Sequence, residues 1–357
     1  MMNDGLSIPI PDIMDIEPGS LASFYTKLKA RGMTKVGILF DEFADEHYRS
    51  RLLAAAPDGV DVEAVKYRNE QTIHDLISRA FEIDRYDAIC AMGGGAVIDA
   101  GKYIAFSRRT PFISIPISPS NDGFASSNCS LYVDGKKTTV PARVPYGIVA
   151  DPAIIETAPR PLVLAGVGDL MSNITALYDW EYEAEIGAAT VHAFASMLSK
   201  KAVNSFIRTP MDDLYSEVFL KELISSLAMG GVSTVISGNS SPISGAEHMI
   251  SHALDRTANK PQMHGVQVGI ASYLMALVHE HRAERMVKVF ERTGFFDYVQ
   301  TLPLNRDEWL YAIEIAPEMK PKRHTYLHEE RHRNRAKELL HTDPVLNRIF
   351  AESSALE

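Results

Sequence analysis

The sequence predicts an α/β domain followed by an all-α domain, and two observations support this prediction. Up to about residue 150, short apolar runs typical of buried strands alternate with segments whose apolar residues have helical spacing. After about residue 160, long helical patterns dominate and strand signals are nearly absent. The stretch 151–161 contains three prolines and separates the two patterns. We therefore expect a first domain at 1–160 and a second domain at 161–357.

The predicted strands of the first domain are apolar runs that end in small or polar residues. The first run ends at Asp41, and a later one ends in three glycines. Strands that alternate with helices predict a parallel sheet that is covered on both faces, with ligand sites at the carboxyl ends of its strands. The expected strands are 35–40, 61–67, 87–92, 111–117 and 146–150, and the expected helices are 71–83 and 96–106.

The second domain is predicted to be helical throughout. Its expected helices are 165–185, 190–206, 214–236, 245–254, 266–283 and 307–315. We expect the site of chemistry to lie in the cleft between this domain and the first.

Composition and charge exclude several classes of protein. The 357 residues carry a formal net charge of −10, which argues against a nucleic-acid partner but permits a small anionic substrate. Two cysteines in a chain of this length are typical of a reducing compartment. The N-terminal segment lacks the features of a signal peptide, and we expect no membrane span. These features predict a cytoplasmic protein that acts on a small molecule, and we expect a homo-oligomer.

A glycine-rich turn follows the third predicted strand. The segment Met92-Gly93-Gly94-Gly95-Ala96-Val97-Ile98-Asp99 leads from a strand into a helix, where backbone N–H groups bind a pyrophosphate well. It matches neither the G-x-G-x-x-G fingerprint nor the P-loop, so a tight turn without a ligand is the alternative. Asp41 is a candidate to accept a hydrogen bond from a ribose hydroxyl of the cofactor. The alternative is that it is only a solvated aspartate in a turn.

Four side chains of the predicted second domain are of the types that bind metal ions. Asp169 is expected near a helix start, His248 and His252 lie four residues apart on one helical face, and His264 opens another helix. One carboxylate and two imidazoles with an open position are typical of a catalytic divalent metal. The alternative is that Asp169 only caps a helix and that the three histidines bind no metal. The segment 328–332 matches H-E-x-x-H but is charged nearly all round, so we interpret it as a solvated helix and not as a zinc protease.

These segments resemble a known family. Residues 93–102 resemble the cofactor turn of the iron-containing alcohol dehydrogenase and dehydroquinate synthase-like superfamily. Residues 120–126, 166–173 and 244–248 look specifically like the sn-glycerol-1-phosphate dehydrogenase branch, and His264-Gly265 is similar to its last metal-binding segment. The resemblance runs from about residue 30 to 330.

The resemblance implies a dehydroquinate synthase-like fold, with a Rossmann-like nucleotide-binding domain and a helical metal- and substrate-binding domain. It implies metal ligands at Asp169, His248 and His264, and catalytic or substrate contacts at Asp122 and His252. It also implies NAD(H) or NADP(H) and one divalent ion, zinc before nickel or iron. The implied cofactor contacts are Asp41, Gly94, Gly95, Ala96, Val97, Ile98, Asp99, Ile117, Ser118, Pro119, Ser120 and Ser126.

The implied reaction interconverts a small ketone and a secondary alcohol, foremost dihydroxyacetone phosphate and sn-glycerol-1-phosphate, as in phospholipid metabolism. Two positions depart from the expected patterns: Asn121 precedes Asp122, and Asn173 replaces the histidine of many iron-dependent relatives. The alternatives are a glycerol or other alcohol dehydrogenase, a small-aldehyde reductase, a dehydroquinate synthase-type lyase and a non-catalytic binding protein. The phosphate-binding residues stay open among Arg143, Lys260 and Arg323.

Overall fold

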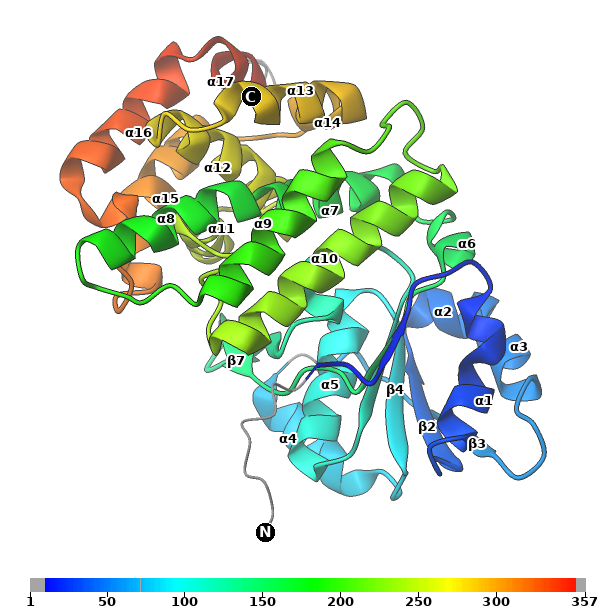
Figure 1. Ribbon diagram of the computed structural model, residues 1–357. Coiled ribbons are helices and arrows are strands. Elements are labelled where there is room, and N and C mark those ends of the chain that lie inside the picture. Colours follow the sequence, from blue (N-terminus) through cyan, green and yellow to red (C-terminus); the bar gives the residue numbers. More distant parts are fainter. Residues whose placement is uncertain (1–9, 71, 351–357) are drawn as a thin grey trace. The chain divides into compact units, whose positions relative to one another are not determined.

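The computed structural model describes residues 10–70 and 72–350, and within it the chain forms two compact units (Figure 1). The first unit comprises Met1–Ala158 and Tyr215–Ile236, and the second comprises Pro159–Leu214 and Ser237–Glu357. The predicted boundary at residue 160 stays a prediction. The structure groups 215–236, which we assigned to the second domain, with the first unit.

The first unit is built on a six-stranded sheet in the order β1-β8-β5-β4-β2-β3, in which every pairing is parallel. The middle strand β4 is buried at all six positions, as expected for a sheet covered on both faces (Figure 1). This architecture confirms the predicted α/β class. The strands are β1 (Ile13–Asp15), β2 (Lys35–Phe40), β3 (Asp61–Val65), β4 (Ala88–Gly93), β5 (Phe112–Pro116) and β8 (Gly147–Val149).

An antiparallel hairpin that we did not predict interrupts this pattern. Strands β6 (Asn128–Val133) and β7 (Lys136–Pro141) pair across a two-residue turn. Asp134 and Gly135 both have positive φ, 50° and 75°, as hairpin turns with an Asp-Gly pair require. The Asp-Gly pair was therefore the available sequence signal.

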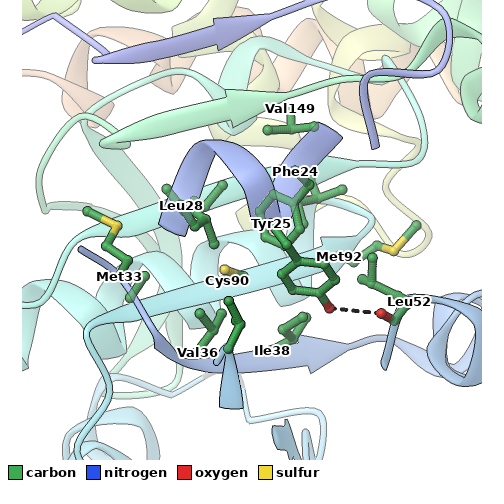
Figure 2. Packing of buried hydrophobic residues seen from close by; sticks show 14 of the residues in the cluster. Phe24, Tyr25, Leu28, Met33, Val36, Ile38, Leu52, Cys90, Met92 and Val149 are labelled. Atoms are coloured by element: carbon green, nitrogen blue, oxygen red, sulfur yellow. Dashed lines mark hydrogen bonds between the residues drawn. The ribbon is translucent and has the colours of Figure 1, made fainter. Parts of the chain in front are cut away.

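The helices of the first unit cover the sheet and close its core. Figure 2 shows part of this core, in which Phe24 and Leu28 pack with Val36, Ile38 and Cys90 of the strands. Each of these five side chains is fully buried. The helices are α1 (Phe24–Lys29), α2 (Glu42–His47), α3 (Arg49–Ala54), α4 (Ile73–Glu82), α5 (Gly95–Arg108), α6 (Pro152–Ile155) and α10 (Glu217–Ser237).

Helix α10 alone among the described helices is long and apolar enough to cross a membrane. Within the fold 67% of its apolar window is buried, which is typical of a core helix. Its Gly231 lies against the backbone of Ala125 and Ser126, where a Cβ would come within 2.7 Å. Close packing at a glycine thus seats α10 on the loop after β5.

The second unit contains no strand among its described residues, as predicted. The expected helix 165–185 is two helices, because the chain turns at Ser172, whose hydroxyl donates to the carbonyl oxygen of Asp169 at 2.6 Å. The helices are α7 (Arg160–Met171), α8 (Asn173–Glu185), α9 (Ala193–Ile207), α11 (Ala246–Thr257), α12 (His264–Val278), α13 (Ala283–Thr293), α14 (Phe295–Gln300), α15 (Arg306–Met319), α16 (Glu330–Thr342) and α17 (Pro344–Ile349).

Helices α7 and α12 approach unusually closely. A Cβ on Gly168 would overlap the carbonyl oxygen of Gly265 and lie 3.1 Å from Cα of Gly269. These glycines permit backbone contact between the two helices. The contact brings Asp169, next to Gly168, beside His264, next to Gly265.

Candidate active site

Three predicted metal ligands from three helices of the second unit meet at one point. His248 lies in the first turn of α11, and His264 is the first residue of α12. Asp169 lies in the last turn of α7 and not near a helix start as expected, because α7 already begins at Arg160. Nε2 of each histidine lies 3.6 Å from Asp169 Oδ1, and the three ligand atoms lie within 4.8 Å of one another. Ligands at 2.0–2.1 Å from one tetrahedral ion are separated by roughly 3.3 Å, so this arrangement fits a single divalent ion.

Hydrogen bonds to the opposite ring nitrogens orient both imidazoles. Glu247 Oε1 accepts from His248 Nδ1 at 2.9 Å, and the Ser251 hydroxyl lies 3.1 Å from His264 Nδ1. In both rings Nε2 is therefore left facing Asp169. Partners of this kind fix the ring orientation and the tautomer of metal-binding histidines.

Burial and charge make this cluster suitable for a cation. Asp169 and His248 are buried, and His264 is half-buried. Burial by itself lowers the pKa of His248, but its hydrogen bonds to Asp169 and Glu247 oppose burial and raise the pKa to about 9. The two carboxylates thus favour positive charge at this point, whether a proton or a metal ion carries it.

His252 lies one helical turn after His248 and adjoins the cluster. Its ring centroid is 6.4 Å from that of His248 and 5.9 Å from that of His264. It is half-buried. The side chain is thus beside the three ligand atoms without being one of them, which suits the predicted contact with substrate.

The glycine turn of the first unit is held from the end of β2. Asp41 Oδ2 accepts from the Gly94 backbone N–H at 2.7 Å, while its Oδ1 caps α2 by accepting from the Ala44 N–H at 2.8 Å. Gly93 has φ 151°, and a Cβ there would overlap the Asp41 carboxylate. Asp41 therefore anchors the turn in this structure, and its contact with a ribose stays a prediction.

The predicted loop after β5 lies beside this turn. Ile117 N–H donates to the Gly93 carbonyl at 3.2 Å, because β4 and β5 are neighbours and end at the same edge of the sheet. Helix α5 begins at Gly95, and its N-cap residue Gly94 provides no side-chain cap. The arrangement leaves the helix start suited to an anion. The predicted cofactor residues Ala96, Val97, Ile98, Ser118, Pro119 and Ser120 lie on these two adjoining segments.

Asp99 and Ser126 both contact the first strand of the hairpin, and the Ser126 hydroxyl donates to the Asn128 carbonyl at 3.4 Å. The Asp99 carboxylate accepts from the Ser130 N–H at 2.9 Å and pairs with Lys102 at 3.3 Å. Burial raises the pKa of Asp99, and Lys102 opposes that shift. Asp99 thus ties α5 to β6, and its predicted contact with a cofactor is untested.

Asp122 begins a short 3-10 helix, Asp122–Phe124, after the loop that follows β5. Asn121 caps this turn by accepting from the Gly123 N–H at 2.8 Å. The Asp122 carbonyl in turn accepts from the N–H groups of Ala125 and Ser126. The unexpected asparagine thus has a structural role, since it shapes the turn that carries Asp122.

Sequence reasoning missed the supporting residues and left the basic side chains unranked. Glu247 directly precedes His248, and that adjacency was the only signal available for its role. Arg323 is bound to Glu183, with Nε–Oε1 and Nη2–Oε2 both at 2.7 Å, whereas Arg143 and Lys260 are exposed. Lys320, which we did not consider, donates to Ser244 at 2.8 Å and to Ser240 at 3.3 Å.

Comparisons with known proteins agree with the resemblance seen in the sequence. Residues 15–159 match the family model described as iron-containing alcohol dehydrogenase. The chain is 37% identical over 255 residues to a glycerol-1-phosphate dehydrogenase [NAD(P)+] of Thermococcus sibiricus, covering 70% of this chain and 73% of that one. It is 29% identical to a protein of the same name from Methanosarcina barkeri, covering 90% of each chain.

Solved structures show the same fold at low identity. Glycerol dehydrogenase from Schizosaccharomyces pombe has a TM-score of 0.75 at 15% identity, covering 97% of this chain and 90% of that chain. A probable glycerol dehydrogenase from Sinorhizobium meliloti has a TM-score of 0.73 at 16% identity, covering 97% and 98%. From its sequence relatives, with this fold in support, the chain belongs to the glycerol-1-phosphate dehydrogenase family of the iron-containing alcohol dehydrogenases.

Proposed function

We propose that this chain catalyses the NAD(P)(H)-dependent interconversion of dihydroxyacetone phosphate and sn-glycerol-1-phosphate at a single divalent metal ion. The observation that carries the proposal is the meeting of Asp169, His248 and His264 within 4.8 Å. The family relatives named for this activity support the substrate. Two imidazoles and one carboxylate suit zinc first, with nickel and iron as the alternatives.

Different residues bind the cofactor, orient the substrate and handle the proton. The glycine turn at Gly94 and Gly95 binds the pyrophosphate of the dinucleotide on the start of α5. When bound, the nicotinamide supplies or accepts the hydride and the ion polarises the substrate oxygen. His252, beside the ligands, holds or moves the proton of the substrate hydroxyl, and Asp122 orients the substrate.

The state of the cysteines bears on the cellular compartment of the enzyme. Both cysteines are free and buried in the described structure, which suits a reducing compartment, and we place the enzyme in the cytoplasm. We further propose that it acts as a homo-oligomer, which light scattering of the purified protein tests.

The experiment that tests the function is NADH and NADPH oxidation by metal-loaded protein with matched ketones. We expect turnover with dihydroxyacetone phosphate at much higher kcat/KM than with dihydroxyacetone, and loss of turnover in Asp169→Ala. Equal rates with both ketones would instead identify a glycerol or other alcohol dehydrogenase. A reaction that leaves nicotinamide absorbance unchanged would point to a lyase of the dehydroquinate synthase type.

A further inference from the structure

The second unit holds a lysine whose charge has no direct counter-ion. Lys320 follows α15 and is half-buried, and its ammonium donates to the hydroxyls of Ser244 at 2.8 Å and Ser240 at 3.3 Å. Within the described part of the chain, no carboxylate oxygen lies within 4.0 Å of Lys320 Nζ. A half-buried ammonium that contacts only neutral hydroxyls leaves its charge available to an anion.

The neighbouring cation, Arg323, is already paired with a carboxylate. Arg323 forms two parallel bonds with the buried carboxylate of Glu183, and its Nη1 also donates to the Ser244 carbonyl at 2.9 Å. An arginine held in this way has its charge neutralised by its partner. Of Lys320 and Arg323, Lys320 is therefore the cation that no carboxylate of the described residues neutralises through a direct contact.

The backbone N–H groups at the start of α11 already have acceptors. The Gly245 N–H donates to Glu247 Oε1 at 2.5 Å, and the Ala246 N–H donates to Asp179 Oδ2 at 2.7 Å. Two buried carboxylates thus occupy the first N–H groups, which are the usual anion site of a helix. An anion near this point therefore depends on side chains, and the described structure places Lys320, Ser240 and Ser244 together here.

Lys320, Ser240 and Ser244 lie close to the predicted metal ligands, because the loop before α11 is linked to both His248 and Asp169. Ser244 precedes Gly245, the N-cap residue of α11, and lies four residues before His248. The Ser172 hydroxyl donates to the Ile243 carbonyl at 3.0 Å and to the Asp169 carbonyl at 2.6 Å. Four residues of chain at a helix start keep the two side chains within roughly one helical turn, about 5.4 Å along the axis. Only one carbon and one oxygen separate the carbonyl carbon from the phosphorus in dihydroxyacetone phosphate, so a phosphate would reach the cluster while the carbonyl lies at the ligands.

We propose that Lys320, Ser240 and Ser244 form the subsite that binds the phosphate group of the substrate. The inference rests on the proposed function and adds the residues that distinguish a phosphorylated ketone from a plain one. The ammonium supplies the charge and the two hydroxyls supply further donors to the phosphate oxygens. The competing interpretation is that Lys320 only offsets the charge of the buried acids Glu247 and Glu183.

The test is the ratio of kcat/KM for dihydroxyacetone phosphate to that for dihydroxyacetone in metal-loaded variants. We expect Lys320→Gln to lower this ratio roughly ten- to a hundred-fold, as for loss of a charged hydrogen bond. The inhibition constant of inorganic phosphate should rise in parallel. Lys320→Arg should restore part of the ratio, and the matched control Lys322→Gln, an exposed lysine two residues away, should keep it.

The outcomes separate the subsite from the function. If the wild type does not prefer the phosphorylated ketone, the proposed function fails, and this inference with it. If the wild type prefers it and Lys320→Gln keeps the ratio, or loses both activities equally, only the subsite is overturned. If Lys320→Gln does not fold, Ser240→Ala and Ser244→Ala test the subsite instead. It is overturned if both variants keep the wild-type ratio of kcat/KM values and the wild-type inhibition constant of phosphate.

Discussion

Glu247 Oε1 accepts a hydrogen bond from Nδ1 of His248 at 2.9 Å, and the glutamate is fully buried. Its other oxygen accepts from the Thr175 hydroxyl at 2.8 Å, so the carboxylate cannot rotate freely. The bond fixes the His248 ring with Nε2 toward Asp169. Glu247, adjacent to His248 in sequence, thus orients a proposed metal ligand and is not itself in the proposed ligand set.

We predict that Glu247→Gln weakens metal binding roughly ten- to a hundred-fold, the effect typical of losing a partner behind a histidine ligand. The amide has the same shape but lacks the charge that stabilises the imidazole N–H. Titration of apo-protein with Zn²⁺ against a competing chelator measures the effect directly. Glu318→Gln, at an exposed carboxylate of α15, is the matched control and should bind zinc as the wild type does. Unchanged affinity in Glu247→Gln would contradict an orienting role.

Gly168→Ala should destabilise the second unit and disturb the metal site together. The added Cβ would overlap the Gly265 carbonyl, which belongs to backbone and cannot rotate away. Helices α7 and α12 must then separate, at a cost of about 1–3 kcal/mol in the free energy of unfolding. Urea denaturation and zinc titration are the measurements. Gly95→Ala, where the nearest atom is 3.7 Å from the Cβ, should leave the free energy of unfolding nearly unchanged. Wild-type stability in Gly168→Ala would show that the helices are not held by this contact.

Binding of a phosphorylated substrate should weaken as pH rises through about 8. Burial and the positive charge of Arg323 lower the pKa of Lys320 to about 8, although Glu247 and Glu183 act in the opposite direction. The substrate phosphate has a second pKa of about 6 and stays a dianion in this range. The cationic lysine binds the dianion, so deprotonation above pH 8 removes the attraction, and binding near pH 8 takes up a proton.

The measurement is KM for dihydroxyacetone phosphate between pH 7 and 10, compared with KM for dihydroxyacetone. Only the phosphorylated ketone should show the rise above pH 8. In Lys320→Arg the rise should disappear, because a guanidinium stays charged throughout. A rise of equal size for both ketones would assign the pH dependence to another group.

The sequence predicted most strands of the first unit and the cluster of Asp169, His248 and His264, because both leave local signals. Buried parallel strands such as 35–40 are continuous apolar runs, and the predicted ligands lie in short motifs. The hairpin 128–141 was missed because β7 is polar and largely exposed, although β6 alternates between buried and exposed side chains. Lys320 left no signal, because its contacts to Ser240 and Ser244 span 80 and 76 residues. Such pairs are set by tertiary packing and not by local pattern.

The last prediction concerns Asp41, which joins two backbone segments of the first unit. Asp41→Ala removes the cap of α2 and the bond to the Gly94 N–H, so it should lower the free energy of unfolding by about 1–2 kcal/mol. Because the glycine turn loses its anchor, the dissociation constant of NADH should rise roughly five- to thirty-fold. Denaturation and NADH fluorescence titration measure the two effects.

Thr72→Ala separates the two roles of Asp41. Thr72 caps α4 by accepting from the Asp75 N–H at 3.1 Å, so its loss costs a similar cap away from the glycine turn. This control should lose stability and keep wild-type affinity for NADH. Asp41→Ser, which retains a capping oxygen but is too short to serve both N–H groups, should recover stability more than NADH affinity. If Asp41→Ala weakened folding as Thr72→Ala does and bound NADH normally, the aspartate would be a helix cap alone, and the cofactor turn would keep its shape without it.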